Sequence, residues 1–115
     1  MAMSTLYEAV EPARAQIDAL DGPTVLEFGA PWCGYCRDAQ PLLARAFASY
    51  PYVRHLKIED ARGRPLGRSF RVKLWPTLVF LQNGREDSRL VRPVDAEEIS
   101  RLLARIAGTG SSAQP

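Results

Sequence analysis

Both cysteines of the chain lie in one short string, Trp32-Cys33-Gly34-Tyr35-Cys36. A thiolate is the species that attacks a disulfide, and a second nearby thiol can displace whatever the first has captured. A bridge between cysteines this close would shut almost no loop in the unfolded chain, so it is poorly suited to stabilising a fold. The pair therefore predicts thiol–disulfide exchange, with Cys33 as the nucleophile and Cys36 as the resolving thiol.

Zinc binding is the other chemistry that paired cysteines suggest. A structural zinc site needs about four ligands. The sequence has a single histidine, His55, and no second cysteine pair, so a closed site within one chain would have to recruit carboxylates. We therefore expect no metal site, and the exchange reaction requires no bound organic cofactor.

The first cysteine needs an element that favours its thiolate. The run from Val25 to Phe28 predicts a buried strand, and an apolar stripe at helical spacing, from Leu42 to Phe47, predicts a helix. If residues 29–32 turn the chain from that strand into that helix, Cys33 lies at the helix N-terminus. Backbone N–H groups and the helix dipole favour negative charge there.

Further apolar runs predict the rest of a mixed sheet. Residues 53–58 form a strand that a helix separates from the first strand, as parallel pairing requires. Residues 77–81 and 88–91 flank Asn83-Gly84 and predict a hairpin with a loop slightly longer than the tightest type.

Helix signals mark both ends of the chain. Asp95 and Glu98 match a capping box for a terminal amphipathic helix that ends at Gly108. Pro12 suits the first turn of a helix running to about Leu20. Residues 6–10 before it are compatible with either a weak edge strand or a helical lead-in.

Several spaced motifs lie within residues 20–107. They are Trp32-Cys33-Gly34-x-Cys36, Pro41 five residues beyond the second cysteine, Trp75-Pro76-Thr77 before a strand, and Asn83-Gly84. Together they resemble the thioredoxin family, which implies an α/β thioredoxin fold with a central mixed β-sheet flanked by helices on both faces. The resemblance also implies exchange with the disulfides of protein substrates, recharging by a separate reductase such as thioredoxin reductase, and a cis Pro76 facing the cysteines.

Aromatic residues flank the cysteines. A core position is the ordinary expectation for tryptophan, but beside an exposed sulfur Trp32 and Trp75 are better placed to line a shallow apolar groove for an extended substrate segment. We expect Gly34, Tyr35 and Pro76 to complete this substrate-binding surface.

Two single residues and one residue pair depart from the usual family pattern. Tyr35 replaces the proline of the commonest thioredoxin motif. Gly29 stands where thioredoxins commonly carry a tryptophan, and Arg92-Pro93 where they commonly carry a glycine.

Glu27 is a charged residue inside an apolar strand. Buried near the cysteines, its carboxyl group could take the proton of Cys36 through a water molecule and return it later. Thioredoxins usually carry an aspartate at the matching position. The alternative is a structural ion pair between Glu27 and Lys57 of the adjacent strand, and both roles can hold together, with Lys57 supporting the proton transfer.

Length and composition are those of a globular domain. The chain has 115 residues, 46% hydrophobic and 24% charged, with a net charge of +2. These values predict one domain over residues 1–107 followed by a disordered tail over 108–115. So small a charge gives no reason to expect a nucleic acid or membrane partner. We expect a monomer in the cytoplasm, or in the periplasm if a signal segment has been removed.

Two other functions remain compatible with these residues. The domain could be a redox-inert adaptor that holds a partner in the same groove and on the basic segment from Arg62 to Lys73, although such segments are usually only solvated. It could also be a dimer in which Cys33 from each chain binds a shared iron–sulfur cluster.

Overall fold

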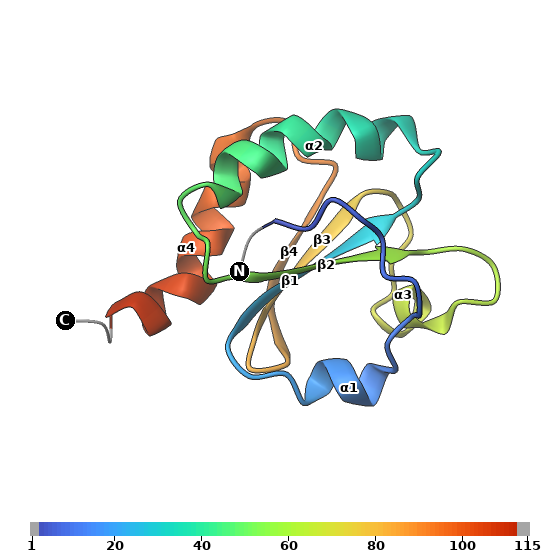
Figure 1. The fold of residues 1–115 in the computed structure, drawn as a ribbon, viewed down its shortest axis with the longest axis horizontal. Coiled ribbons are helices and arrows are strands. Elements are labelled where there is room, and N and C mark those ends of the chain that lie inside the picture. The colour runs from blue at the N-terminus through green and yellow to red at the C-terminus, as the bar shows by residue number, and fades with distance from the viewer. Residues whose placement is uncertain (1–2, 113–115) are drawn as a thin grey trace.

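Four strands form one mixed sheet at the centre of the structure (Figure 1), a computed structural model that describes residues 3–112. The strand order is β2-β1-β3-β4, with β1 parallel to β2 and antiparallel to β3, and β3 antiparallel to β4. This arrangement confirms the predicted mixed sheet. The strands are β1 (Pro23–Gly29), β2 (Arg54–Glu59), β3 (Thr77–Gln82) and β4 (Arg85–Val91).

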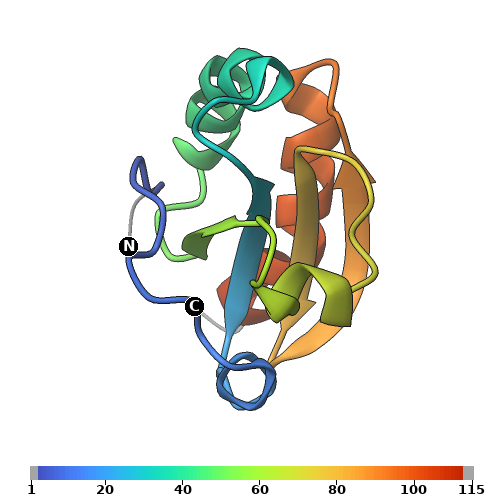
Figure 2. The same ribbon diagram turned by 90° about the vertical axis from the view of Figure 1, so that its right-hand side faces the viewer.

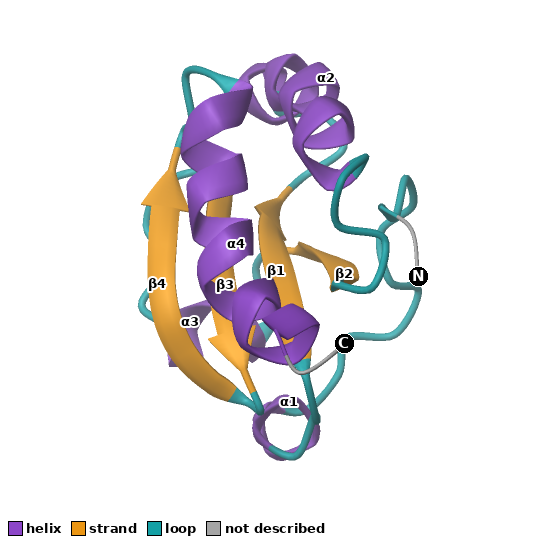
Figure 3. Cartoon of the chain, turned by 90° about the vertical axis from the view of Figure 1, so that its left-hand side faces the viewer, coloured by secondary structure: helices purple, strands orange, loops and turns teal. Residues whose placement is uncertain are grey.

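Helices cover both faces of this sheet, as predicted. Figure 3 shows α4 in front of the sheet with α3 behind it, and Figure 2 shows the opposite side, with α3 in front and α4 behind. None of the helices in the described part of the chain is long and apolar enough to cross a membrane. The helices are α1 (Arg14–Asp18), α2 (Gly34–Phe47), α3 (Pro65–Ser69) and α4 (Ala96–Ser112).

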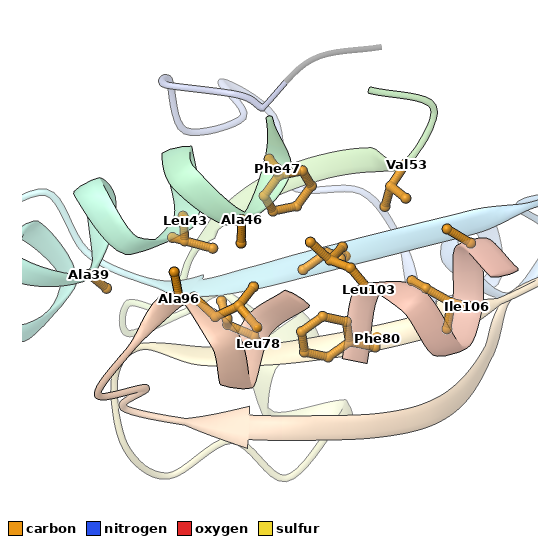
Figure 4. Packing of buried hydrophobic residues seen from close by; sticks show 13 residues of the cluster. Ala39, Leu43, Ala46, Phe47, Val53, Leu78, Phe80, Ala96, Leu103 and Ile106 are labelled. Carbon is orange, nitrogen blue, oxygen red and sulfur yellow. The ribbon is translucent and has the colours of Figure 1, made fainter. Parts of the chain in front are cut away.

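Alternation along the strands divides the core into two layers. Val25 of β1 and Phe80 of β3 belong to the layer packed under α2 and α4 (Figure 4), whereas Leu26 of β1 belongs to the layer on the α1 and α3 side. Because successive strand residues point to opposite faces, Glu27 shares the face of Val25, beneath α2. The strand thus directs one carboxylate to the same side of the sheet as the apolar residues under α2 and α4.

The hairpin between β3 and β4 is tighter than predicted. Only Asn83 and Gly84 separate the strands, with φ of 52° and 79°, so β4 begins at Arg85 rather than at Ser88. Both values lie in the left-handed region, as a two-residue type I′ turn requires. The prediction was wrong because residues 85–87 are charged and exposed on an edge strand, where no apolar alternation marks the strand.

The terminal helix begins as predicted and ends later. The Glu98 N–H donates to Asp95 Oδ1 at 2.9 Å, and the Asp95 N–H donates to Glu98 Oε2 at 3.3 Å, which is the expected capping box. The helix then continues past Gly108 to Ser112. Extending an existing helix gains a hydrogen bond for each added residue, so a single glycine costing about 1 kcal/mol does not have to end it. Residues 113–115 of the predicted tail lie outside the described residues.

The N-terminal segment lies along the edge of the sheet. Tyr7 forms an isolated parallel bridge with Lys57 of β2, and the Glu8 N–H donates to the Lys57 carbonyl at 2.9 Å. Residues 6–10 are therefore neither a strand nor part of a helix, and α1 begins only at Arg14. The bridge brings Tyr7 to the side of the sheet where Lys57 lies.

Candidate active site

The cysteines lie where β1 leads into α2. Cys33 is the N-cap of α2, and the backbone N–H of Cys36 donates to its sulfur at 3.2 Å. Both cysteines are free thiols, Cys33 partly exposed and Cys36 buried with 2% exposure. Among the described residues, no group of three or more His, Cys, Asp and Glu side chains could hold a metal ion. The predicted start of the helix at the cysteines is confirmed, and the accessible sulfur is the one at the helix N-terminus.

The two thiols differ in their surroundings. Burial, followed by the neighbouring sulfur of Cys33, raises the pKa of Cys36 to about 12. Cys36 therefore keeps its proton at neutral pH. A base must remove that proton before Cys36 can attack.

Gly29 leaves the space in which the Cys36 sulfur sits. A Cβ atom added at Gly29 would lie 2.5 Å from Cys36 Sγ and 3.4 Å from the hydroxyl oxygen of Tyr7. Burial, and then repulsion from the negative charge that Cys36 carries as a thiolate, raises the pKa of Tyr7. The phenol therefore remains protonated, as a neutral hydroxyl on the same side of the strand as the buried sulfur.

Glu27 is the centre of a buried polar network beneath α2. Its side chain has no exposed surface, and His55 Nε2 lies 2.9 Å from its Oε1. Gln40 Nε2 donates to Oε2 at 2.9 Å, and Lys57 Nζ lies 3.8 Å from the same oxygen. The expected ion pair between Glu27 and Lys57 is thus present, although Gln40 holds the carboxylate more closely than Lys57 does.

His55 is a member of this network that the sequence analysis missed, because it considered His55 only as a zinc ligand. Its signal was its spacing: His55 and Lys57 share one face of β2, and Lys57 pairs in register with Glu27. The Ser4 N–H donates to His55 Nδ1 at 2.9 Å. Nδ1 is therefore an acceptor, so the proton of the neutral ring is on Nε2 and points to Glu27.

Gln40 connects the network to the resolving cysteine. Its Oε1 accepts from Lys57 Nζ at 2.9 Å, and its Nε2 donates to the backbone carbonyl of Cys36 at 2.7 Å as well as to Glu27. Because an ammonium group only donates and a carboxylate only accepts, these partners fix the orientation of the amide. Gln40 follows Cys36 by four residues, which is the spacing that places two side chains on one face of a helix.

A pocket opens between the N-terminal segment and the start of α2. Its volume is about 530 Å³, and Cys36, Tyr7, Gln40 and Lys57 are among the residues that line it. Most of the pocket's lining is apolar, but the side chains of Tyr7, Gln40 and Lys57 supply polar groups, and the volume has room for several water molecules. The resolving thiol and the edge of the Glu27 network therefore border one space.

The predicted substrate-binding residues differ in exposure. Trp32 and Tyr35 are 62% and 59% exposed, and Gly34 is exposed as well. Trp75 is half-buried, and its indole N–H donates to Asp60 Oδ2 at 2.9 Å. The peptide between Trp75 and Pro76 is cis, as expected, and Pro76 is buried.

Arg92 joins two parts of this surface. Its Nε donates to the Trp75 carbonyl at 2.8 Å, and its guanidinium carbon lies 3.9 Å from the centre of the Tyr35 ring. Its φ is 50°, in the left-handed region of the backbone. Any residue other than glycine costs about 1–2 kcal/mol in this conformation. This backbone conformation explains why a glycine suits the position. Arg92 departs from the family pattern in the sequence, but no sequence signal predicts its contacts with the Trp75 carbonyl and the Tyr35 ring.

The basic segment after β2 is mostly solvated. Arg62, Arg68, Arg71 and Lys73 are exposed. Arg64 differs, because its Nε lies 3.6 Å from Glu11 Oε2. The segment thus gives no specific support for an adaptor surface.

Known proteins match this chain in both sequence and fold. The family model described as Thioredoxin matches residues 7–105. A thioredoxin of Chlamydia muridarum is 35% identical over 85 residues, which cover 73% of this chain and 82% of that protein. The structure of thioredoxin 2 from Pseudomonas aeruginosa in its reduced form is 56% identical, has a TM-score of 0.83, and aligns over 94% of this chain and 100% of that one. With its two cysteines at the C-x-x-C spacing on the predicted fold, the chain belongs to the thioredoxin family and is a thiol–disulfide oxidoreductase.

Proposed function

We propose that this protein reduces the disulfides of other proteins in two steps, with Cys33 and Cys36 in different roles. The Cys33 thiolate attacks one sulfur of the substrate disulfide, forms a mixed disulfide and releases the other substrate sulfur as a thiolate. Cys36 then gives up its proton and attacks Cys33 Sγ. This step forms the Cys33–Cys36 disulfide, releases the second substrate thiolate, and completes the transfer of two electrons to the substrate.

The observation that carries this assignment is the asymmetry of the two thiols. Cys33 is partly exposed, caps the helix, and accepts an N–H hydrogen bond at its sulfur, so its sulfur is the one that a substrate disulfide can reach. Cys36 is buried, and its raised pKa keeps its proton in place until the mixed disulfide has formed. An accessible sulfur suits capture of the substrate, and a buried thiol suits resolution of the mixed disulfide.

Glu27 accepts the proton that Cys36 loses. The hydrogen bonds of the Glu27 carboxylate go to His55 and Gln40, and Cys36 rather than Glu27 lines the pocket, so the proton passes through water that enters from the pocket beside Cys36. His55, Gln40 and Lys57 act as positioning residues, because their donors hold the carboxylate in place. This role extends the proton-relay support predicted for Lys57.

The substrate lies across Trp32, Gly34, Tyr35, Trp75 and Pro76. The exposed aromatic rings suit an extended apolar segment next to the disulfide. A separate reductase, such as thioredoxin reductase, returns two electrons to the Cys33–Cys36 disulfide after each cycle. The protein acts as a monomer in the cytoplasm. Its sequence has no cysteines other than the active pair, which suits a reducing compartment.

Reduction of insulin by dithiothreitol tests this function. We expect the wild-type protein to accelerate the appearance of turbidity from the freed insulin B chain. Cys33→Ser should abolish the acceleration, because the captured intermediate cannot form. A wild-type protein that does not accelerate insulin reduction would contradict the proposed function.

A further inference from the structure

Arg92 is a half-buried cation with most of its hydrogen-bonding capacity unused. One of the five guanidinium N–H donors, that of Nε, is directed at the Trp75 carbonyl. Neither terminal nitrogen donates to a protein acceptor among the residues whose side chains are described. Four donors, arranged as a planar fork, are thus left for a ligand.

The charge of Arg92 is also unpaired within the described part of the chain. Arg14, Arg64, Arg89 and Arg105 each lie within 4.0 Å of a carboxylate oxygen in an ion pair, whereas Arg92 has none. The Tyr35 ring beneath it and the Trp75 carbonyl beside it hold the guanidinium in one place. The protein therefore keeps an open cation fixed on its substrate-binding surface, at the expense of a left-handed backbone.

We propose that Arg92 is a specificity-determining residue that binds a carboxylate of the substrate, an Asp or Glu side chain next to the disulfide under attack. A planar guanidinium with two free nitrogens matches a carboxylate in a bidentate geometry. Tyr35 lies between the two cysteines and Trp75 directly precedes Pro76, so a carboxylate on Arg92 would lie beside the segment that Cys33 attacks. This inference rests on the proposed function, because it needs a disulfide substrate on that surface.

Three peptides test the inference. Each contains the same intramolecular disulfide and differs only at two flanking positions, which hold Glu, Gln or Lys. The rate constant for reduction by the reduced protein is measured for each peptide by stopped-flow tryptophan fluorescence. Salt at about 0.15 M screens interactions between charges farther apart than about 8 Å. The direct contact between Arg92 and the flanking side chain of the peptide therefore dominates the result.

We expect the wild-type protein to reduce the Glu peptide about tenfold faster than the Gln peptide, and the Lys peptide more slowly than both. Arg92→Gln should bring the Glu-to-Gln ratio close to one. Arg92→Lys keeps the charge but loses the fork and the Nε hydrogen bond, so its ratio should fall about threefold. Arg92→Glu should invert the preference between the Glu and Lys peptides.

Arg85→Gln is the matched control. Arg85 is exposed and starts β4, at the end of the strand opposite Arg92. The substitution removes the same charge as Arg92→Gln does. We expect it to keep the wild-type ratio. A wild-type ratio in Arg92→Gln, or an equal loss in Arg85→Gln, would overturn the role of Arg92 and leave the proposed function intact. Failure of the wild-type protein to reduce any of the peptides would instead overturn the proposed function together with this inference.

Discussion

Glu27 and His55 show how a single residue depends on its partners in a buried network. The carboxylate has no exposed surface, and each of its oxygens has a donor within 2.9 Å. Removing His55 leaves one oxygen of the buried carboxylate without its donor, although Gln40 and Lys57 still contact the other oxygen, whereas removing the charge as well costs much less. The arrangement therefore predicts strong energetic coupling between the two residues.

A double-mutant cycle measures this coupling. His55→Phe keeps an aromatic ring against Phe47, whose ring centre lies 4.8 Å from that of His55, but removes the donor to Glu27. We expect it to lower the free energy of unfolding by about 2 kcal/mol in the wild-type background. In Glu27→Gln, which carries no charge, the same change should cost at least about 1 kcal/mol less.

Urea unfolding of the reduced protein, followed by circular dichroism, gives the four free energies. The cycle is its own control, because effects of the phenylalanine on packing occur in both backgrounds. Additive costs would show that His55 does not interact with the carboxylate.

At the scale of elements, the strand and the helix around the cysteines could be predicted from the sequence. The connections between strands could be predicted only in part. The strand before Cys33 and the helix after it follow from apolar periodicity, and both were found as expected. The charged start of β4 carried no periodicity, so the tight hairpin was missed. Local patterns report burial, and an exposed edge strand buries too little to produce one.

Contacts between distant elements were the other part that sequence could not provide. The Tyr7 bridge to β2 and the Arg92 contact with Tyr35 join segments far apart in the chain. No spacing rule brings such residues together, because their proximity depends on the assembled sheet. The ion pair between Glu27 and Lys57 was predictable, since parallel pairing of adjacent strands sets their register.

Across the whole molecule, the buried thiol of Cys36 and the half-buried phenol of Tyr7 link stability to pH. Burial raises the pKa of Cys36 to about 12 and raises that of Tyr7, so the folded state binds both protons more tightly than the unfolded state does. Their contribution is complete below the unfolded thiol value of about 8.5, and it is lost as pH rises toward the folded values.

We therefore expect the reduced protein to lose stability above about pH 9, by at most about 1.4 kcal/mol per pH unit for each group. Urea unfolding at a series of alkaline pH values measures the slope. Cys36→Ala and Tyr7→Phe should each make the slope shallower, since each removes one titrating group. Slopes in both variants equal to that of the reduced wild-type protein would contradict the linkage.

The central claim is that Cys33 captures the substrate and Cys36 releases it, and trapping of the intermediate tests it most directly. Each single cysteine variant is mixed with a disulfide-containing protein such as insulin, quenched with acid, and analysed by intact mass spectrometry and peptide mapping. We predict that Cys36→Ser accumulates a mixed disulfide through Cys33, because no thiol remains to resolve it, and that Cys33→Ser accumulates none. Capture of the substrate by Cys36 in Cys33→Ser, with no adduct in Cys36→Ser, would contradict the account.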